Sequence, residues 1–276
     1  MRADLEVDVG WDAVDVLPSL PRLRMADAAG NIATIANRNL VKFYRNRQLL
    51  LLSVVQPLTN MMLFAYVFNG VAHIPGTSYR EYVIPGVLIQ AVMVTAMRTG
   101  VTVSYDSDSG MNDRFRSLPI ARSAVLIGRT LSDTARIALQ TIVLTVIACT
   151  AVGYHFSAGA FRAVPFVLSI TCFGLAVTTF SAWVGLVASD PESAQTILIT
   201  PTLPLVFGSS GFAPVSRLPG WMQLFAEVNP VTAAVDLVRA LAVGGQLVTP
   251  FIHYLLWTGG ITATFTCLAV RRYQRG

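Results

Sequence analysis

The chain has 276 residues, of which 54% are hydrophobic and only 13% are charged, with a mean hydropathy of +0.59. Soluble domains carry about a quarter charged residues, so this composition excludes an ordinary soluble domain and predicts an integral membrane protein. The net charge is +5, and its source is nineteen arginines beside the single lysine Lys42, an imbalance that indicates a GC-rich genome, typical of actinobacteria, rather than a function.

Residues 1–25 are expected to form a flexible acidic tail, and residues 26–276 a single transmembrane domain. The tail carries five carboxylates within its first fifteen residues and has no continuous apolar core. This is the reverse of a cleavable signal peptide, so the first true span is expected to act as the insertion signal.

The stretch 29–47, AGNIATIANRNLVKFYRNR, is too polar to cross a membrane, but it has one apolar face. Ile32, Ile35, Leu40 and Phe43 share that face at helical spacing, with cationic side chains opposite or at its border. The pattern predicts a helix that lies along the inner membrane surface and binds anionic headgroups. A cytoplasmic helix packed on a partner protein would show the same pattern.

Six apolar runs are long enough, or nearly so, to cross a hydrocarbon core of about 30 Å as helices. They are residues 49–71, 82–104, 137–154, 164–188, 194–212 and 249–270. The fifth contains TPTLP at 200–204, whose two prolines should kink it. None alternates as barrel strands do, so the predicted fold class is an all-α integral membrane protein with six transmembrane helices.

The basic residues predict that both termini are cytoplasmic. With that orientation, fifteen of the twenty Arg and Lys residues lie in cytoplasmic segments and four lie outside. This is the bias of the positive-inside rule. The predicted location is therefore the cell membrane, with bilayer lipids as neighbours and no nucleic-acid partner.

The cytoplasmic connection at 105–136 is the candidate docking element. Its first part is a short predicted helix that combines an apolar knob with flanking charges, made by Met111, Asp113, Arg114, Phe115, Arg116 and Leu118. A partner's groove can hold such a helix, although a loop that seals the cytoplasmic end of the bundle would look the same. A second helix begins near Ser123, with predicted ion pairs Arg129–Asp133 and Asp133–Arg136.

Polar and soft side chains inside the spans are weak candidates for a substrate path, namely Gln90, Met93, Gln195 and Thr200. Bonds between helices are the commoner use of such residues. Arg98 lies near the cytoplasmic end of its span, where snorkelling to the headgroups accounts for it. The three cysteines and three histidines have no ligand spacing, so no metal site is predicted.

The stretch 225–245, FAEVNPVTAAVDLVRALAVGG, predicts a short helix between two very apolar segments. Asn229 suits the N-cap and Pro230 the first helical position. Asp236 and Arg239 lie three residues apart and can pair on a face away from the apolar stripe.

Two absences limit the chemistry of the chain. Lys42 is followed by Phe43, so the chain has no phosphate-binding loop, which requires Lys followed by Ser or Thr. No Asp or Glu lies inside the six predicted spans, whereas ion-coupled carriers usually keep an intramembrane carboxylate. Any uphill transport is therefore expected to draw its energy from another subunit.

Two segments carry a family resemblance: RFRSLPIARSAVLIGRTLSD at 114–133 and SSGFAPVSRLPGWMQLFAEVNPVTAAVDLVRAL at 209–241. They resemble the ABC-2 type permeases, and most of all the daunorubicin-resistance group of ABC exporter membrane subunits. The resemblance covers about residues 28–275. Its most specific part is an ordered series made of Phe212, Pro214, Pro219, Trp221, Asn229, Pro230 and Arg239.

The resemblance implies six spans, an N-terminal interfacial helix, and a coupling helix at 109–118 that docks on an ATPase subunit. It further implies two re-entrant outer helices, at 216–228 and 229–243, beside the exit. Trp221 would lie at headgroup depth, and Asp236 and Arg239 would satisfy each other. A purely structural outer cap is the alternative for these two helices.

The expected function is the membrane subunit of an ATP-driven exporter that moves an amphipathic lipid or hydrophobic drug outward. The chain would pair with a second copy or a paralogous permease and with a dimer of ABC ATPase subunits. The chain itself is not expected to be an enzyme or to bind a cofactor, because ATP and magnesium belong to the ATPase. The alternatives are a glycan exporter of the same architecture, an ATPase-independent secondary carrier, and a membrane scaffold.

Overall fold

The computed structural model describes residues 47–67, 78–109 and 122–275, and within these ranges the regular elements are all helical. The longer elements are α2 (Arg47–Met62), α3 (Tyr79–Asp108), α5 (Arg122–Ile147), α6 (Ala163–Val187), α7 (Pro191–Ile199), α8 (Thr202–Phe207), α9 (Gly220–Glu227), α10 (Pro230–Val243) and α11 (Val248–Arg275). Two π-helical segments, η2 (Leu63–Val67) and η3 (Ala148–Val152), extend α2 and α5, and two 3₁₀ turns, η4 (Ala160–Arg162) and η5 (Val215–Arg217), precede α6 and α9.

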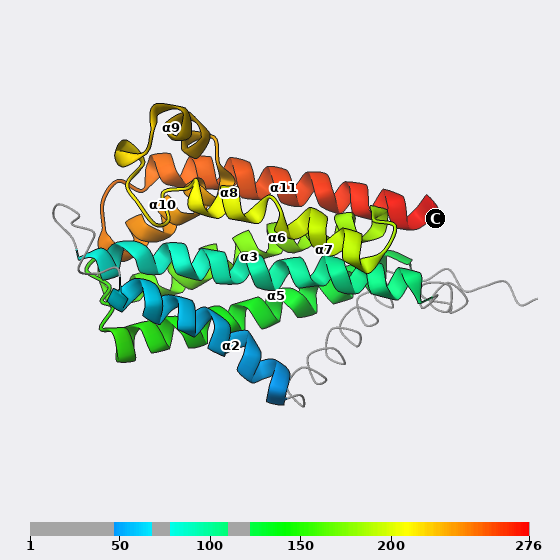
Figure 1. The fold of residues 1–276 in the computed structure, drawn as a ribbon, viewed down its shortest axis with the longest axis horizontal. Coiled ribbons are helices and arrows are strands. Elements are labelled where there is room, and N and C mark those ends of the chain that lie inside the picture. Colours follow the sequence, from blue (N-terminus) through cyan, green and yellow to red (C-terminus); the bar gives the residue numbers. More distant parts are fainter. Residues whose placement is uncertain (1–46, 68–77, 110–121, 276) are drawn as a thin grey trace, which may run out of the picture.

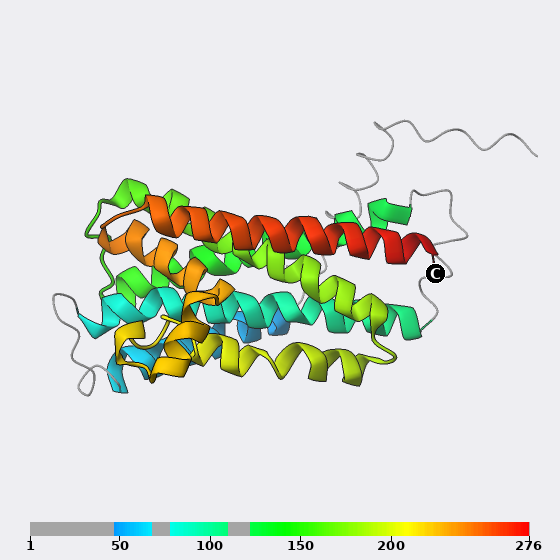
Figure 2. The ribbon, with the colours of Figure 1, turned by 90° about the horizontal axis from the view of Figure 1, so that it is seen from above.

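The long helices run lengthwise beside one another, and the short helices α9 and α10 lie at one end (Figure 1). The start of α3 and the end of η3 lie at the same end. The C-terminal end of α11 and the end of α3 lie at the opposite end (Figures 1 and 2). The bundle therefore has two distinct ends, as a protein that crosses a bilayer requires.

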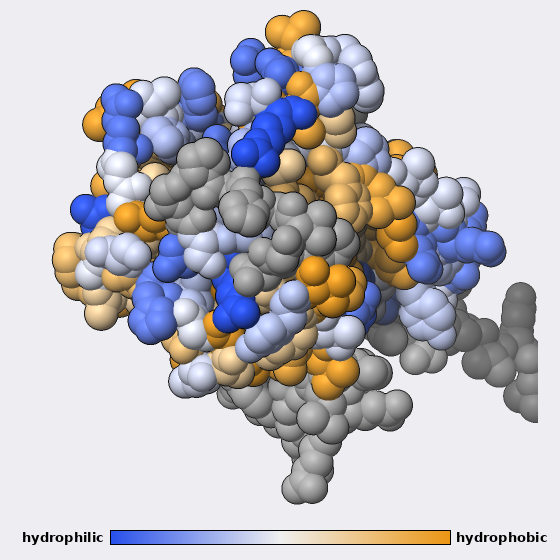
Figure 3. All heavy atoms as spheres, turned by 60° about the vertical axis from the view of Figure 1, so that its left-hand side comes forward, coloured by the Kyte–Doolittle hydropathy of each residue, from blue (hydrophilic) through white to orange (hydrophobic). Residues whose placement is uncertain are grey.

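Three helical segments are long and apolar enough to cross a membrane, namely Tyr79–Asp108, Gly128–Val152 and Ala160–Val187. They correspond to the second, third and fourth predicted spans. A shorter apolar segment, Val54–Val67, falls within the first predicted span, and α11, at 28 residues, is long enough for a sixth but is not among the three apolar segments. Figure 3 shows that hydrophobic residues cover part of the flank, while hydrophobic and hydrophilic residues mix on the end that faces the viewer.

Glycines allow α3 and α6 to cross in direct backbone contact. A Cβ atom on Gly100 would overlap the carbonyl of Ser181, and one on Gly185 would overlap the carbonyl of Gly100. The Ser181 hydroxyl also donates to the Ala96 carbonyl at 2.8 Å. Small residues of this kind let membrane helices pack closely. Close packing drives their association, because lipid tails are as apolar as the helix surfaces and there is no hydrophobic driving force between helices.

The fifth predicted span is broken, as its prolines predict. The helix α7 ends at Ile199, α8 begins at Thr202, and Pro201 lies between them. A proline has no N–H for the helical ladder, and its ring clashes with the preceding turn. The two short helices still continue along the bundle, so the break changes their direction without ending the segment (Figures 1 and 2).

Asp190 starts α7 as its N-cap. Its carboxylate accepts from the backbone N–H of Ser193 at 2.8 Å and from the hydroxyls of Ser193 and Ser189 at 2.7 and 2.8 Å. These donors stabilise the ionised form and lower the pKa of Asp190 to about 2, the backbone bond contributing most. The turn between α6 and α7 therefore keeps a full negative charge at neutral pH.

Ion pairs join α3 to α5 near the end of the bundle that holds the C-terminus. Asp133 pairs with Arg136 at 3.3 Å, as the spacing predicts, and also accepts from the Thr99 hydroxyl at 2.7 Å. Arg129 differs from the prediction, because it binds Asp106 of α3 rather than Asp133. Spacing along one helix does not reveal a carboxylate brought close by another helix.

Gly185→Leu should lower the thermal unfolding midpoint of the purified protein sharply, because the new side chain must push α3 away from α6. Overpacking of this kind costs typically about 1–3 kcal/mol, and a backbone contact leaves less room to relax than a side-chain contact. Gly259→Leu in α11 is the matched control, since nothing lies within 4 Å of a Cβ at that position. Equal shifts of the midpoint for both variants would show that the crossing does not need glycine.

Candidate functional site

The helix α10 begins with the predicted cap and is almost entirely buried. The Asn229 side chain accepts from the Val231 backbone N–H at 2.9 Å, and Pro230 occupies the first turn. The other end of the same amide donates to the carbonyl of Leu205 in α8 at 2.7 Å. Asn229 therefore starts α10 and also attaches it to the end of the broken fifth segment.

Arg239 is the centre of a polar cluster between α10, the start of α3 and the segment after α8. Its guanidinium pairs with Asp236 at 3.1 Å and donates to the carbonyls of Ser210 at 2.7 Å and Tyr82 at 3.3 Å. It also stacks on the Tyr82 ring, 3.8 Å from the centroid. We call these four residues the Arg239 cluster.

The remaining members of the Arg239 cluster satisfy one another. The Tyr82 hydroxyl donates to the Ser210 carbonyl at 2.9 Å, and the Ser210 hydroxyl donates to Asp236 at 2.5 Å. The backbone approach beneath them is very close, because a Cβ on Gly86 of α3 would overlap the carbonyl of Gly211. The predicted ion pair is thus confirmed: Arg239 packs against α3, whereas the Asp236 side chain is 41% exposed.

The helix α9 presents an exposed apolar surface. Trp221 is 74% exposed and Leu224 is 68% exposed, although both are large and hydrophobic. Side chains of this kind at the end of a bundle are typical of contact with a membrane surface. The predicted headgroup depth of Trp221 fits this exposure and stays a prediction.

A groove of about 570 Å³ opens between α2, α3, α7 and α8. It is within the usual size of a small-molecule site. Its walls are mainly apolar, with Val94, Val101, Leu198, Ile199 and Leu203 among them. Its polar lining consists of three glutamine side chains, two threonines and one arginine: Gln56, Gln90, Gln195, Thr102, Thr202 and Arg98.

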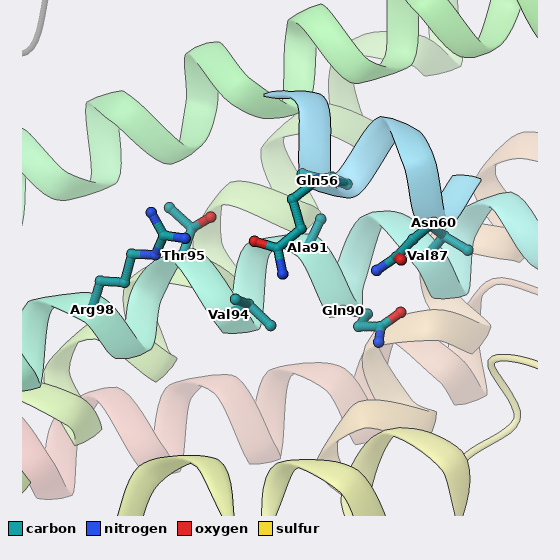
Figure 4. A pocket seen from close by; sticks show the side chains of 9 residues that line it. Gln56, Asn60, Val87, Gln90, Ala91, Val94, Thr95 and Arg98 are labelled. Carbon is teal, nitrogen blue, oxygen red and sulfur yellow. The ribbon is translucent and has the colours of Figure 1, made fainter. Parts of the chain in front are cut away.

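Figure 4 shows a smaller pocket beside this groove, between α2 and α3, that shares Gln56, Gln90, Val94 and Arg98 with it. Gln56 points from α2 toward α3, and Arg98 and Gln90 project from α3 at different levels along the same groove. The Gln90 Oε1 atom is buried and has no hydrogen-bond partner within the described part of the chain. No Asp or Glu of the described residues pairs with Arg98.

The structure brings two of the four predicted path residues together. Gln90 and Gln195 line the same groove although they are far apart in the sequence. Met93 is 3% exposed and packs in the core, and Thr200 lies at the break between α7 and α8 outside the lining. Sequence reasoning did not find that Gln56 lines the groove. Its position as a polar residue in the middle of an apolar run could have indicated this.

The predicted docking residues lie outside the described ranges, as do the acidic tail at 1–25 and nearly all of the stretch at 29–47. This applies to Met111, Asp113, Arg114, Phe115, Arg116 and Leu118. Among the described residues, no group of three or more His, Cys, Asp or Glu side chains could hold a metal ion.

Comparison with known proteins gives the family directly. The family model described as "ABC-2 type transporter" matches residues 30–243, which include the groove, the broken fifth segment and the whole Arg239 cluster. The chain belongs to the ABC-2 type transporter family. The resemblance drawn from the motifs is thereby confirmed.

Similar proteins include drug-resistance permeases and putative transport permeases. The chain is 32% identical over 223 residues to the daunorubicin resistance ABC transporter permease protein DrrB1 of Streptomyces coeruleorubidus, covering 80% of this chain and 78% of that protein. It is 24% identical over 240 residues to the probable doxorubicin resistance ABC transporter permease protein DrrC of Mycobacterium tuberculosis, covering 87% and 86% of the two chains. It is 22% identical over 222 residues to the putative transport permease ycf38 of Porphyra purpurea, covering 79% and 76%. The chain is thus an ABC-2 permease of the drug-resistance exporter type.

Arg239→Ala should lower the free energy of unfolding by at least about 2 kcal/mol, because it leaves two backbone carbonyls and Asp236 without their charged donor. Arg239→Lys should recover only part of the loss, since an ammonium cannot reproduce the planar fork that binds several acceptors. Thermal unfolding and protease resistance of the purified protein measure both effects. The control is Arg217→Ala, at an exposed position of η5. If that control is as destabilising, the cluster is not what holds this end of the bundle together.

Proposed function

We propose that this chain is the membrane-spanning subunit of an ATP-driven exporter that moves an amphipathic lipid or hydrophobic drug outward. The observation that carries the proposal is the match of the ABC-2 family model to residues 30–243. The groove between α2, α3, α7 and α8 supports it, because its mainly apolar walls with a few polar side chains suit an amphipathic cargo.

The proposed membrane topology has six spans with both termini in the cytoplasm. The spans are α2 with η2, α3, α5 with η3, α6, the broken pair α7 and α8, and α11. Three of them are the apolar segments described above. The end of α3 and the C-terminal end of α11 lie at the same end of the bundle, which supports a shared cytoplasmic face (Figure 1). On this topology α9 and α10 are the re-entrant outer helices, and residues 29–47 form the interfacial helix.

The proposed partners are a dimer of ABC ATPase subunits and a second permease, either another copy of this chain or a paralogue. ATP and magnesium bind to the ATPase, and this chain contributes the cargo path. ATP-driven closure of the ATPase dimer pushes the coupling helix at 109–118 of each permease. The push tilts the spans and opens the groove toward the outer end. The Arg239 cluster holds α10 to α3, so movement of α3 is transmitted to that outer helix.

Purification of the tagged full chain from its native host in mild detergent tests this proposal. An ATPase with a phosphate-binding loop, recovered in stoichiometric amount and active only with this chain, is the expected result. A second permease in the same complex would identify a heterodimer. Cargo flux that persists without every ATPase partner would instead favour a secondary carrier, and flux of a lipid-linked sugar chain would favour a glycan exporter.

Phe115→Asp should abolish both ATPase recovery and transport, because it places a charge where the coupling helix is proposed to present its apolar knob. Phe115→Leu is the matched control and should retain both, since it preserves an apolar side chain of similar reach. Co-purification and ATP-dependent flux measure the effect. An intact, active complex with Phe115→Asp would show that residues 109–118 do not couple the two subunits.

A further inference from the structure

The groove between α2, α3, α7 and α8 contains a positive charge that no described carboxylate offsets. Arg98 lines it, and no carboxylate is among its described lining residues. In contrast, Arg129, Arg136 and Arg239 each form an ion pair with an aspartate. Arg98 therefore differs from the arginines that hold helices together.

Arg98 lies on the groove side of α3, away from the end of that helix. It lies ten residues before Asp108, the end of α3, which is roughly 15 Å at the helical rise of about 1.5 Å per residue. Figure 4 shows its guanidinium beside Thr95, one turn toward the N-terminal end of α3 and away from that helix end. The cation thus lies along the groove, where its exposed side chain is open to a ligand.

The rest of the polar lining offers hydrogen bonds but no negative charge. Gln56 and Gln195 are exposed in the groove, and the buried Gln90 Oε1 has no described partner. The Thr202 hydroxyl is already used, since it donates to the Leu198 carbonyl at 2.9 Å. Primary amides can bind hydroxyl, carbonyl and acid groups alike, so Arg98 is the group that selects among charged ligands.

We propose that this groove selects an anionic amphiphile, with Arg98 binding the phosphate or carboxylate of its head and the Val94, Val101 and Leu198 wall contacting its apolar part. This proposal rests on the proposed function and adds the charge class of the cargo. A cationic head of the same size would meet Arg98 without any carboxylate to offset the repulsion. The groove therefore discriminates by charge as well as by hydrophobicity.

Photo-crosslinking of the full chain in nanodiscs of phosphatidylcholine tests the proposal. The probes are dodecyl phosphate and dodecyltrimethylammonium that carry the same diazirine on the alkyl chain, with labelled peptides mapped by mass spectrometry. Dodecyl phosphate should label α3 and α7 at least about tenfold more efficiently than dodecyltrimethylammonium does, because a charge-assisted hydrogen bond strengthens binding by that factor or more. Equal labelling by the two probes in the wild-type chain overturns the proposal without any variant.

Three variants assign the preference to Arg98. Arg98→Gln should abolish it and Arg98→Lys should keep most of it, whereas Arg217→Gln, at an exposed outer position, should leave it unchanged. Undiminished preference in Arg98→Gln overturns the assignment. The assignment is also overturned if the wild-type chain is a dimer and Arg98→Gln converts it into monomers, since Arg98 would then serve assembly between copies.

Phosphatidylglycerol added to the nanodiscs separates two sources of the anion. Loss of labelling by dodecyl phosphate would identify a bilayer phospholipid as the occupant. Unchanged labelling would identify a smaller anionic cargo. Both results agree with an anionic occupant. Crosslinking needs neither ATP nor the ATPase, so it stands apart from the purification experiment. Charge-selective labelling without a recovered ATPase would retain this inference and reject the exporter proposal. A recovered ATPase with equal labelling by the two probes would reject this inference and retain the exporter proposal.

Discussion

The constraint on which the structure depends is that polar groups inside a bilayer must find partners within the protein. The chain breaks its helices after Ile199 and again between α8 and α10, and each break frees backbone carbonyls. Between α8 and α10, Asn229 binds the carbonyl of Leu205 and Arg239 binds that of Ser210. Irregular backbone is tolerated at this end of the bundle because these two side chains supply the missing donors.

The helix α3 connects the two candidate functional regions. Tyr82 near its start belongs to the Arg239 cluster, and Arg98 in its second half lines the groove. They are sixteen residues apart, or about 24 Å by helical rise. The glycine crossing between α3 and α6 lies beyond Arg98 and has no intervening side chains at the contact. A tilt of α3 about that crossing would move the outer cluster and the groove together, which is the coupling that an exporter requires.

Local sequence signals predicted the local features well. The Asn229 cap, Pro230 in the first turn, the Asp236–Arg239 pair and the break at Pro201 each depend on residues within four positions of one another. Their physical causes act along one helix, so spacing is sufficient to predict them. The family motifs gave the ABC-2 membership in the same way, because their order and spacing are specific.

Features that depend on packing between distant segments were not predictable. Tyr82 and Ser210 are 128 residues apart, and Arg129 finds Asp106 on another helix. Sequence reasoning placed Arg98 among snorkelling residues, because a single helix gives its distance from the membrane surface but not what lies opposite. Gln90 and Gln195 were weak candidates for the same reason, until the structure showed that α3 and α7 form one groove.

The central claim is that the groove is a cargo path whose accessibility follows the ATPase cycle. The most direct measurement uses Gln195→Cys in a chain whose Cys149, Cys172 and Cys267 have been replaced, reconstituted with its ATPase in proteoliposomes. The rate of labelling by a membrane-impermeant maleimide is recorded from each side, with and without a non-hydrolysable ATP analogue and magnesium. The account predicts that labelling from the cytoplasmic side falls several-fold when nucleotide is bound, while labelling from the outer side rises. Rates that are the same in both states would contradict it.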